Sequence, residues 1–162
     1  MINIITADSN ELILKTKELF QEYASSLGFD LSFQDFEKEM ATFPVQYAPP
    51  QGRLCLAQYR HEIVGCVGLR DLGGGICEMK RMYVKPNYRV QGLGRALAKA
   101  IINEARNIGY THMRLDTIPS MKAAVSLYTS LGFKEIEPYR FNPIEGARFM
   151  ELELKMHNRR TL

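Results

Sequence analysis

The chain has 162 residues, of which 46% are hydrophobic and 24% charged, and its formal net charge is +3. Such a length and composition are typical of one globular domain with a sizeable core, taken here to span residues 1–162. The small charge does not indicate a nucleic-acid partner. Because we find neither a signal-peptide pattern nor an apolar run long enough to cross a bilayer, we expect a cytoplasmic protein without a membrane partner.

Residues 3–6 predict a short first strand, and a helix is predicted to follow it. Asp8, with Glu11 three residues later, resembles a capping box at the start of this helix, and Gly28 is a typical helix end. The apolar residues between these signals recur on one helical face: Leu12, Leu19, Phe20, Tyr23 and Leu27.

A second helix is predicted from Ser32, a candidate cap, to Pro44, which ends it. Its apolar stripe consists of Phe33, Phe36, Met40 and Phe43. The segment 45–52 is predicted to be a loop, because Pro49, Pro50 and Gly52 lie near its end. Tyr47 in this loop is a candidate exposed aromatic residue.

Residues 53–59 and 63–70 are apolar runs separated by a turn, which predicts a β-hairpin. Three glycines at 73–75 predict another turn, and residues 76–84 form the next strand. Along this strand the apolar positions change from odd to even numbers. Because side chains of a strand alternate with period two, the change predicts a β-bulge near Lys80 and Arg81.

The stretch 82–97 predicts the end of a strand, a turn with glycines at 92 and 94, and the start of a helix near Leu93. The first N–H groups of a helix lack partners and lie at the positive end of its dipole, so this turn is a candidate anion site. Arg89 and Arg95 add positive charge. A dinucleotide fingerprint would require glycine at Leu97, and a P-loop would require Gly-Lys-Ser/Thr, so the pattern excludes both.

The helix that starts at Leu93 is predicted to end at Gly109, and residues 113–117 form the next strand. This strand-helix-strand order predicts a parallel pair. A further helix opens at Pro119 and Ser120, and residues 133–137 and 148–156 complete the chain as two strands. The expected fold is a single α/β (α+β) domain with a mixed, mostly antiparallel sheet of six to seven strands flanked by helices.

Two motifs resemble the GNAT superfamily of N-acetyltransferases. The first is Arg-x-x-Gly-x-Gly, starting at Arg89 after a strand that ends Tyr-Val-x-Pro. The second is Ala-x-x-Leu-Tyr-x-x-x-Gly-Phe over residues 124–133. Members of the family often have asparagine seven residues before the tyrosine of this motif. Met121 occupies that position here, and Ser120 is the nearest polar residue.

The resemblance implies acetyl-CoA as co-substrate and no metal. The residues that it assigns to the cofactor are Met82, Tyr83, Val84, Arg89, Val90, Gln91, Gly92, Leu93, Gly94 and Arg95. It also assigns Tyr128 as the general acid that protonates the leaving thiolate. For a general base our first choice is Glu78, on the bulged strand, and Asp116 is the alternative; a salt-bridged, structural role of Glu78 stays open.

The implied reaction is acetyl transfer to a primary amine of a small molecule or an amino-acid-like acceptor. Residues in or near loops that would surround this acceptor are Tyr47, Arg70, Asp116, Tyr139 and Asn142. Two alternatives stay open, namely acetylation of a protein amine and non-catalytic binding of acyl-CoA, and a homodimer is possible.

The cysteines are three in number, Cys55, Cys66 and Cys77, and no Cys-x-x-Cys pair occurs among them. All three lie in apolar or strand-like surroundings. We therefore interpret them as small buried hydrophobic residues rather than as disulfide partners or metal ligands.

Overall fold

A seven-stranded sheet with the order β1-β2-β3-β4-β5-β7-β6 forms the centre of the computed structural model, which describes residues 1–28, 30–31, 35–118 and 122–155. The strands are β1 (Ile2–Thr6), β2 (Arg53–Tyr59), β3 (Glu62–Gly73), β4 (Ile76–Val84), β5 (His112–Thr117), β6 (Lys134–Ile136) and β7 (Arg148–Glu153). The helices are α1 (Asn10–Ser26), α2 (Phe36–Ala41), α3 (Leu93–Ile108) and α4 (Lys122–Ser130), with the 3₁₀ turns η2 (Val45–Tyr47) and η3 (Pro86–Gln91).

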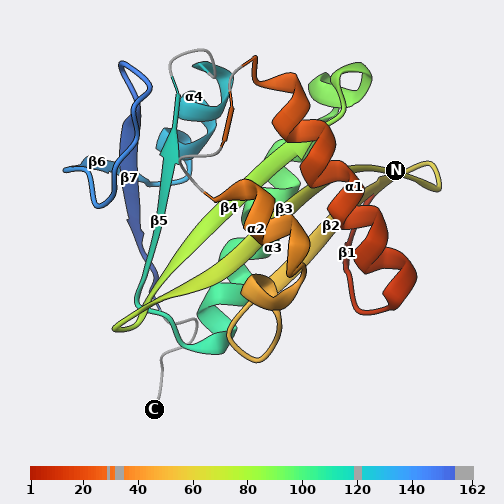
Figure 1. Ribbon diagram of the computed structural model, residues 1–162, viewed down its shortest axis with the longest axis horizontal. Helices are drawn as coiled ribbons and strands as arrows, with labels where there is room; N and C mark the ends of the chain where they lie inside the picture. Colours follow the sequence, from red (N-terminus) through yellow and green to blue (C-terminus); the bar gives the residue numbers. More distant parts are fainter. Residues whose placement is uncertain (29, 32–34, 119–121, 156–162) are drawn as a thin grey trace.

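The sheet is mixed, as predicted. Its strands pair antiparallel except for β4 and β5, which are parallel because α3 carries the chain back across one face of the sheet between them. Helices α1 and α2 cover one face, and α3 lies on the other (Figure 1). No helix in the described part of the chain has both the length and the apolar character that a membrane crossing requires.

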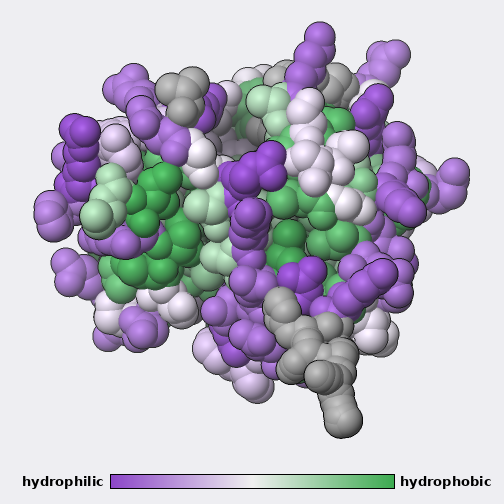
Figure 2. Space-filling model, turned by 180° about the vertical axis from the view of Figure 1, so that it is seen from behind, coloured by the Kyte–Doolittle hydropathy of each residue, from purple (hydrophilic) through white to green (hydrophobic). Residues whose placement is uncertain are grey.

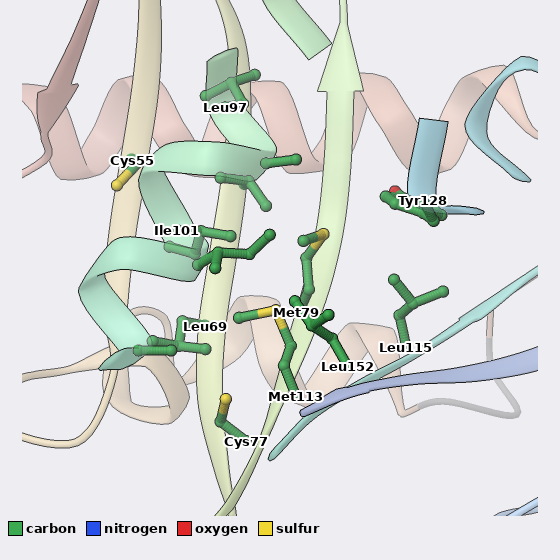
Figure 3. Packing of buried hydrophobic residues seen from close by; sticks show 14 of the residues in the cluster. Cys55, Leu69, Cys77, Met79, Leu97, Ile101, Met113, Leu115, Tyr128 and Leu152 are labelled. Atoms are coloured by element: carbon green, nitrogen blue, oxygen red, sulfur yellow. The ribbon is translucent and has the colours of Figure 1, made fainter. Parts of the chain in front are cut away.

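Two hydrophobic cores fill the spaces between the sheet and its helices. The larger core joins α3 and α4 to the sheet, with Leu97 and Ile101 of α3 packed toward the strands (Figure 3). The smaller core joins α1, α2 and η2 to the opposite face and contains Phe20 and Tyr47. The three cysteines are buried in these cores as free thiols, which confirms their interpretation as small hydrophobic residues.

The exposed side of α3 is polar. From behind, the molecule shows a hydrophilic strip that separates two more hydrophobic areas (Figure 2). Arg95, Lys99 and Asn103, which follow one another at four-residue spacing along α3, are exposed. An apolar face against the sheet and a polar face toward solvent are the expected pattern for a helix that covers one layer of a domain.

The start of α1 differs in detail from the prediction. Ser9, not Asp8, is the N-cap, and its side chain accepts a hydrogen bond from the Leu12 N–H at 3.2 Å. Ser9 has the extended backbone that a cap requires and directly precedes the first helical residue. The predicted cap of the second helix, Ser32, lies outside the described residues, as do the predicted helix start at Pro119 and Ser120 and the last residue of the predicted 148–156 strand.

The bulge predicted in β4 is confirmed. The register between β3 and β4 shifts between the pairs Cys66↔Tyr83 and Gly68↔Lys80, and Arg81 has a φ of 60° in this interval. On its other edge, β4 pairs with β5 only from Ile76 to Glu78. Beyond that point the two strands diverge (Figure 1), so the sheet opens between them.

Candidate active site

A cavity of about 370 Å³ lies where the opened end of β4 meets the N-terminal end of α3 and the helix α4. Its lining residues are Tyr23, Ser26, Met82, Tyr83, Val84, Arg89, Gly92, Gly94, Arg95, Lys122, Ala123, Ala124, Leu127 and Tyr128. We call this cavity the cleft. The cleft brings together residues of both sequence motifs, which lie in separate segments of the chain.

Three of the predicted cofactor residues, Val90, Gln91 and Leu93, are not among the residues that line the cleft. Gln91 is exposed at the end of η3, and the side chain of Leu93 is buried in the larger core. Leu93 can therefore offer only its backbone N–H to a ligand. Nothing is described for the side chain of Val90.

The turn before α3 has the geometry of an anion site. Gly92 is the N-cap with a φ of 80°, and no side chain caps the helix there. The first intrahelical bond is donated by Ala96 to the Gly92 carbonyl at 3.2 Å, so the N–H groups of the three residues between them have no intrahelical acceptor. A Cβ at Gly92 would meet nothing within 4 Å, so the space beside the turn is open.

Two arginines beside this turn keep their charge available. Arg89 donates from Nε to the Val84 carbonyl at 2.8 Å, and its guanidinium lies 5.6 Å from the centroid of the Tyr83 ring. Arg95 donates from Nη2 to the Ser130 hydroxyl at 2.9 Å. Both contacts orient a guanidinium without neutralising it. The turn and the two arginines thus fit a pyrophosphate group such as that of coenzyme A.

Beyond Glu78, the edge of β4 that faces the opening has no strand partner in the described residues. On its other edge this part of β4 pairs with β3 at Met79, Lys80, Tyr83 and Val84. An extended ligand chain can pair with such an edge in the manner of an added strand. The edge leads directly to Met82, Tyr83 and Val84 in the cleft wall.

Tyr128 lies in the cleft wall opposite β4. The residue is 6% exposed, and its ring centroid lies 5.6 Å from that of Phe133. Figure 3 shows the ring at the end of the larger core, with the hydroxyl oxygen turned toward β4. Burial raises the pKa of this hydroxyl above its usual range, so it is protonated at neutral pH. No hydrogen-bond partner for it occurs among the described residues, which leaves its proton available to a ligand.

Glu78 is fully buried, and its carboxylate is already bound on both oxygens. Arg70 donates to Oε1 at 2.8 Å, Tyr139 donates to Oε2 at 2.7 Å, and Arg140 forms a further short ion pair. Burial alone would raise the pKa of Glu78, but the nearby cations Lys80, Arg140 and Arg70 outweigh it and lower the pKa to about 2. These contacts favour the salt-bridged, structural role of Glu78 over the role of general base, because both carboxylate oxygens are already engaged by donors.

The predicted acceptor residues lie in three different places. Asp116 and Asn142 do come together, since the Asn142 amide donates to the Asp116 carboxylate at 3.1 Å. Arg70 is held by Glu78. Tyr47, expected to be exposed, is only 1% exposed, and its hydroxyl donates to Glu39 Oε2 at 2.8 Å. The prediction for Tyr47 was wrong because the residue turns into the smaller core through η2 instead of remaining in an open loop.

The segment between β6 and β7 closes over this part of the sheet. The ring of Tyr139 packs edge-on against Phe149 at 5.2 Å, and the guanidinium of Arg114 lies 5.3 Å from the Tyr139 centroid. These contacts lay the segment across β5 and β7 and bring Tyr139 and Arg140 to Glu78. No His, Cys, Asp or Glu cluster suited to a metal ion occurs in residues 1–28, 30–31, 35–118 and 122–155.

Sequence reasoning missed several residues of this region. Lys122 lines the cleft, but apart from its positive charge nothing in the sequence indicates this position. Glu39 does carry one, because it lies three residues after Phe36 and four before Phe43 and is therefore a charged residue on an apolar helical stripe. Such a residue requires a buried partner, and Arg81 is that partner.

Comparison with known proteins agrees with the two motifs. The model of the acetyltransferase (GNAT) family matches residues 15–133. An uncharacterised N-acetyltransferase of Schizosaccharomyces pombe is 44% identical over 140 residues, which cover 85% of this chain and 86% of that protein. The crystal structure of an acetyltransferase of the GNAT family from Staphylococcus aureus has a TM-score of 0.76 at 26% identity, covering 96% of this chain and 100% of that chain.

A further structure shows the same fold with a ligand. The protein yncA from Salmonella typhimurium, solved with its cofactor acetyl-CoA, has a TM-score of 0.68 at 21% identity and covers 96% of this chain and 95% of its own. At that identity the likeness concerns the fold. The family match, the close relative and the cleft together lead to one conclusion. The chain belongs to the GNAT family and is an acetyl-CoA-dependent N-acetyltransferase.

Proposed function

We propose that this enzyme acetylates the primary amine of a small, amino-acid-like acceptor by direct transfer, with Tyr128 as general acid. The observation that carries the proposal is the position of a buried, protonated hydroxyl in the wall of the same cleft as the anion-binding turn at Gly92. Bound acetyl-CoA supplies the thioester that the amine attacks.

The chain's own groups have three tasks in this proposal. The N–H groups at the start of α3, with Arg89 and Arg95, bind the pyrophosphate. Backbone groups on the free edge of β4, next to Met82, orient the acyl end and offer donors to its carbonyl oxygen. Tyr128 donates its proton to the leaving thiolate.

Proton transfer from a phenol is reasonable for this leaving group. The ordinary pKa of a tyrosine is about 10 and that of a thiol about 8.5. Burial raises the Tyr128 pKa further, so the hydroxyl first hydrogen-bonds the sulfur, and the proton moves only as the carbon–sulfur bond breaks and negative charge develops on the sulfur. Burial keeps the Tyr128 hydroxyl protonated until that moment. A neutral hydroxyl also avoids placing a negative charge beside the departing thiolate.

The acceptor is proposed to approach from the side of Asp116. This carboxylate and the amide of Asn142 form a polar pair at the end of β5. Asp116 provides a negative charge for an acceptor ammonium and is the carboxylate that we assign to receive its proton. Arg70 and Arg140 share the single carboxylate of Glu78, so their surplus positive charge suits an acceptor that also carries a carboxylate.

A small acceptor is favoured over a protein. A peptide would need an open groove beside Tyr47 and Asn142. Tyr47 is buried, Asn142 is bound to Asp116, and the segment with Tyr139 and Arg140 packs across the neighbouring sheet. These contacts leave little room for a peptide on the side from which the acceptor approaches. The free hydroxyl of Tyr128 disfavours a purely binding role.

The test is a free-thiol release assay with acetyl-CoA and a panel of acceptors. The panel pairs amino acids with their amides and simple amines, and includes short peptides. We expect turnover with small amines, higher kcat/KM for acceptors that retain a carboxylate, and little turnover with peptides. Thiol release no faster with any amine than in buffer alone would refute the proposed reaction, and preferential turnover of peptides would refute the proposed acceptor class.

A further inference from the structure

Arg81 occupies an unusual position in the bulge of β4. Its φ of 60° is in the left-handed region, which is sterically unfavourable for a residue with a Cβ. The side chain is also buried, at 3% exposure. A large charged residue persists in such a conformation only where its surroundings hold it there.

The surroundings hold Arg81 at both its side chain and its backbone. The Glu39 carboxylate of α2 accepts from Nη2 at 2.9 Å and from Nε at 3.3 Å. The guanidinium lies 5.2 Å from the centroid of the Phe36 ring. The carbonyl of Arg81 accepts from the Cys66 thiol on β3 at 3.4 Å. Burial alone would lower the pKa of Arg81, but its hydrogen bond with Glu39 raises it, so the arginine stays charged.

Glu39 is held in turn by Tyr47. The Tyr47 hydroxyl donates to Glu39 Oε2 at 2.8 Å, and burial raises the Tyr47 pKa well above its usual range, which keeps the hydroxyl a donor. The Tyr47 ring packs directly on the backbone of Gly68, where an added Cβ would be 2.7 Å from Cε1. Gly68 pairs with Lys80 next to the bulge. We call the side chains of Glu39, Tyr47 and Arg81 the clamp.

The clamp lies next to the cleft but outside it. Arg81 immediately precedes Met82, Tyr83 and Val84 of the cleft wall, whereas Glu39 and Tyr47 are not among the residues that line the cleft. The backbone turn at Arg81 decides in which direction the free edge of β4 continues after the bulge. Loss of the clamp would release the left-handed conformation and turn the donors of that edge away from the acyl group.

We propose that Glu39 is a positioning residue that acts through Arg81 to aim the free edge of β4 at the thioester carbonyl. The inference rests on the proposed acetyl transfer. It assigns α2 a role in the rate of the chemical step, although this helix contributes no residue to the cleft lining. The pyrophosphate is bound elsewhere, by the turn at Gly92, so the clamp should affect the rate and not cofactor affinity.

The experiment compares Glu39→Gln, Arg81→Gly and the double variant. Gln keeps the size of Glu39 but removes its charge, and Gly keeps the left-handed backbone while removing the side chain. We expect about a tenfold or larger fall of kcat in each single variant, because misplacement by a fraction of an ångström is costly. The dissociation constant of coenzyme A, measured by calorimetry, should change less than about threefold. The double variant should be no slower than the slower single variant, because both changes break one unit.

A matched control is Glu104→Gln, which removes an ion pair of similar length, 3.0 Å to Arg53, between α3 and β2. It should retain the wild-type rate. Amide hydrogen exchange at residues 82–84 gives a readout that does not depend on activity. We expect exchange there to be about tenfold faster in Glu39→Gln and unchanged in Glu104→Gln.

Each contrary result has a distinct meaning. A wild-type rate in Glu39→Gln, equal losses of rate and cofactor affinity, or multiplicative losses in the double variant would each overturn the positioning role. Unchanged exchange at residues 82–84 would overturn it even if no acceptor were turned over. If the wild type released no thiol but Glu39→Gln still accelerated this exchange, the proposed reaction would fail and the mechanical role of the clamp would stand.

Discussion

The cleft and the neighbouring site around Glu78 both contain arginines, but their arginines are used differently. In the cleft, Arg89 and Arg95 donate to a carbonyl and a hydroxyl, which are neutral groups. Around Glu78, Arg70 and Arg140 share one buried carboxylate. A cation that is oriented by neutral oxygens keeps its charge for a ligand, whereas a cation paired with a buried carboxylate mainly holds the structure together.

Because the arginines differ in this way, substitutions in the two regions should change different measured quantities. Changes in the cleft should reduce rate or cofactor affinity with little loss of folding stability. Changes around Glu78 should lower the free energy of unfolding. They should have little effect on the pH dependence of the rate. Three substitutions, two in the cleft and one at Glu78, test this difference between the two regions.

Tyr128→Phe should lower kcat by about 10²–10⁴, the usual contribution of general-acid catalysis. The ring and its packing against Phe133 are retained, so the free energy of unfolding and the dissociation constant of acetyl-CoA should change little. Steady-state kinetics, calorimetry and urea unfolding measure the three quantities. Tyr88→Phe, which removes a hydroxyl bonded to Glu62 outside the cleft, is the control. A near-wild-type rate in Tyr128→Phe would make Tyr128 a core residue and the mechanism wrong.

Glu78→Gln should lower the free energy of unfolding at pH 7 by about 3–5 kcal/mol, because it leaves two arginines without their buried counter-charge. The folded pKa of Glu78, about 2, is below the ordinary value of 4.5. Its stabilisation is therefore complete above about pH 4.5 and is lost as the pH falls toward 2.

Urea unfolding at several pH values tests this sign. The difference between the wild type and Glu78→Gln should narrow from pH 5 to pH 3, whereas the exposed Glu145→Gln should differ little from wild type throughout. The fraction of activity that Glu78→Gln retains should not depend on pH. A rate loss concentrated at low pH and relieved at high pH would restore Glu78 as a base and break the division between the two regions.

Gly92→Val should weaken coenzyme A binding by about tenfold or more, because the new side chain fills the open space beside the turn and strains a left-handed residue. The strain alone is worth about 1–2 kcal/mol of stability. Gly109→Val is the matched control, since Gly109 ends the same helix with a φ of 112° and open space around it. Both variants should lose similar stability, but only Gly92→Val should lose affinity. Equal affinities would rule out the anion site.

The parts of the structure that were predictable are those encoded within short stretches. The bulge followed from the change of parity along one strand, and the parallel pair followed from the crossover through α3. Most of the cleft followed from residues 82–97 and 124–133, each of which is continuous in the sequence. A motif that is continuous in the sequence can be predicted because the local backbone conformation alone brings its residues together.

The parts that escaped prediction depend on contacts between distant segments. Glu78 is buried by partners on β3 and on the segment after β6, and nothing in its immediate sequence indicates Arg140. Tyr47 was misjudged because prolines and glycines around it suggested an open loop. Its burial depends on Gly68, whose missing side chain leaves room for the ring. Nothing in the residues around Tyr47 indicates Gly68, because the two positions meet only when η2 packs on β3.

The short pairing between β4 and β5 also has a mechanical consequence. In the described residues the strand ladder between the two halves of the sheet covers Ile76–Glu78 and His112–Arg114, and the N–H groups of Thr111 and His112 also donate to the Gly75 carbonyl. The halves are further coupled through side chains. Tyr139 and Arg140 bind Glu78, and apolar residues pack on α3, with Met113 and Leu152 from one half and Met79 from the other (Figure 3). Apolar contacts are not directional, so they permit small rotations that a full strand ladder would forbid. Beyond the short ladder, the opening between β4 and β5 is therefore held by side-chain contacts, and a change in these contacts would alter its width without breaking backbone hydrogen bonds.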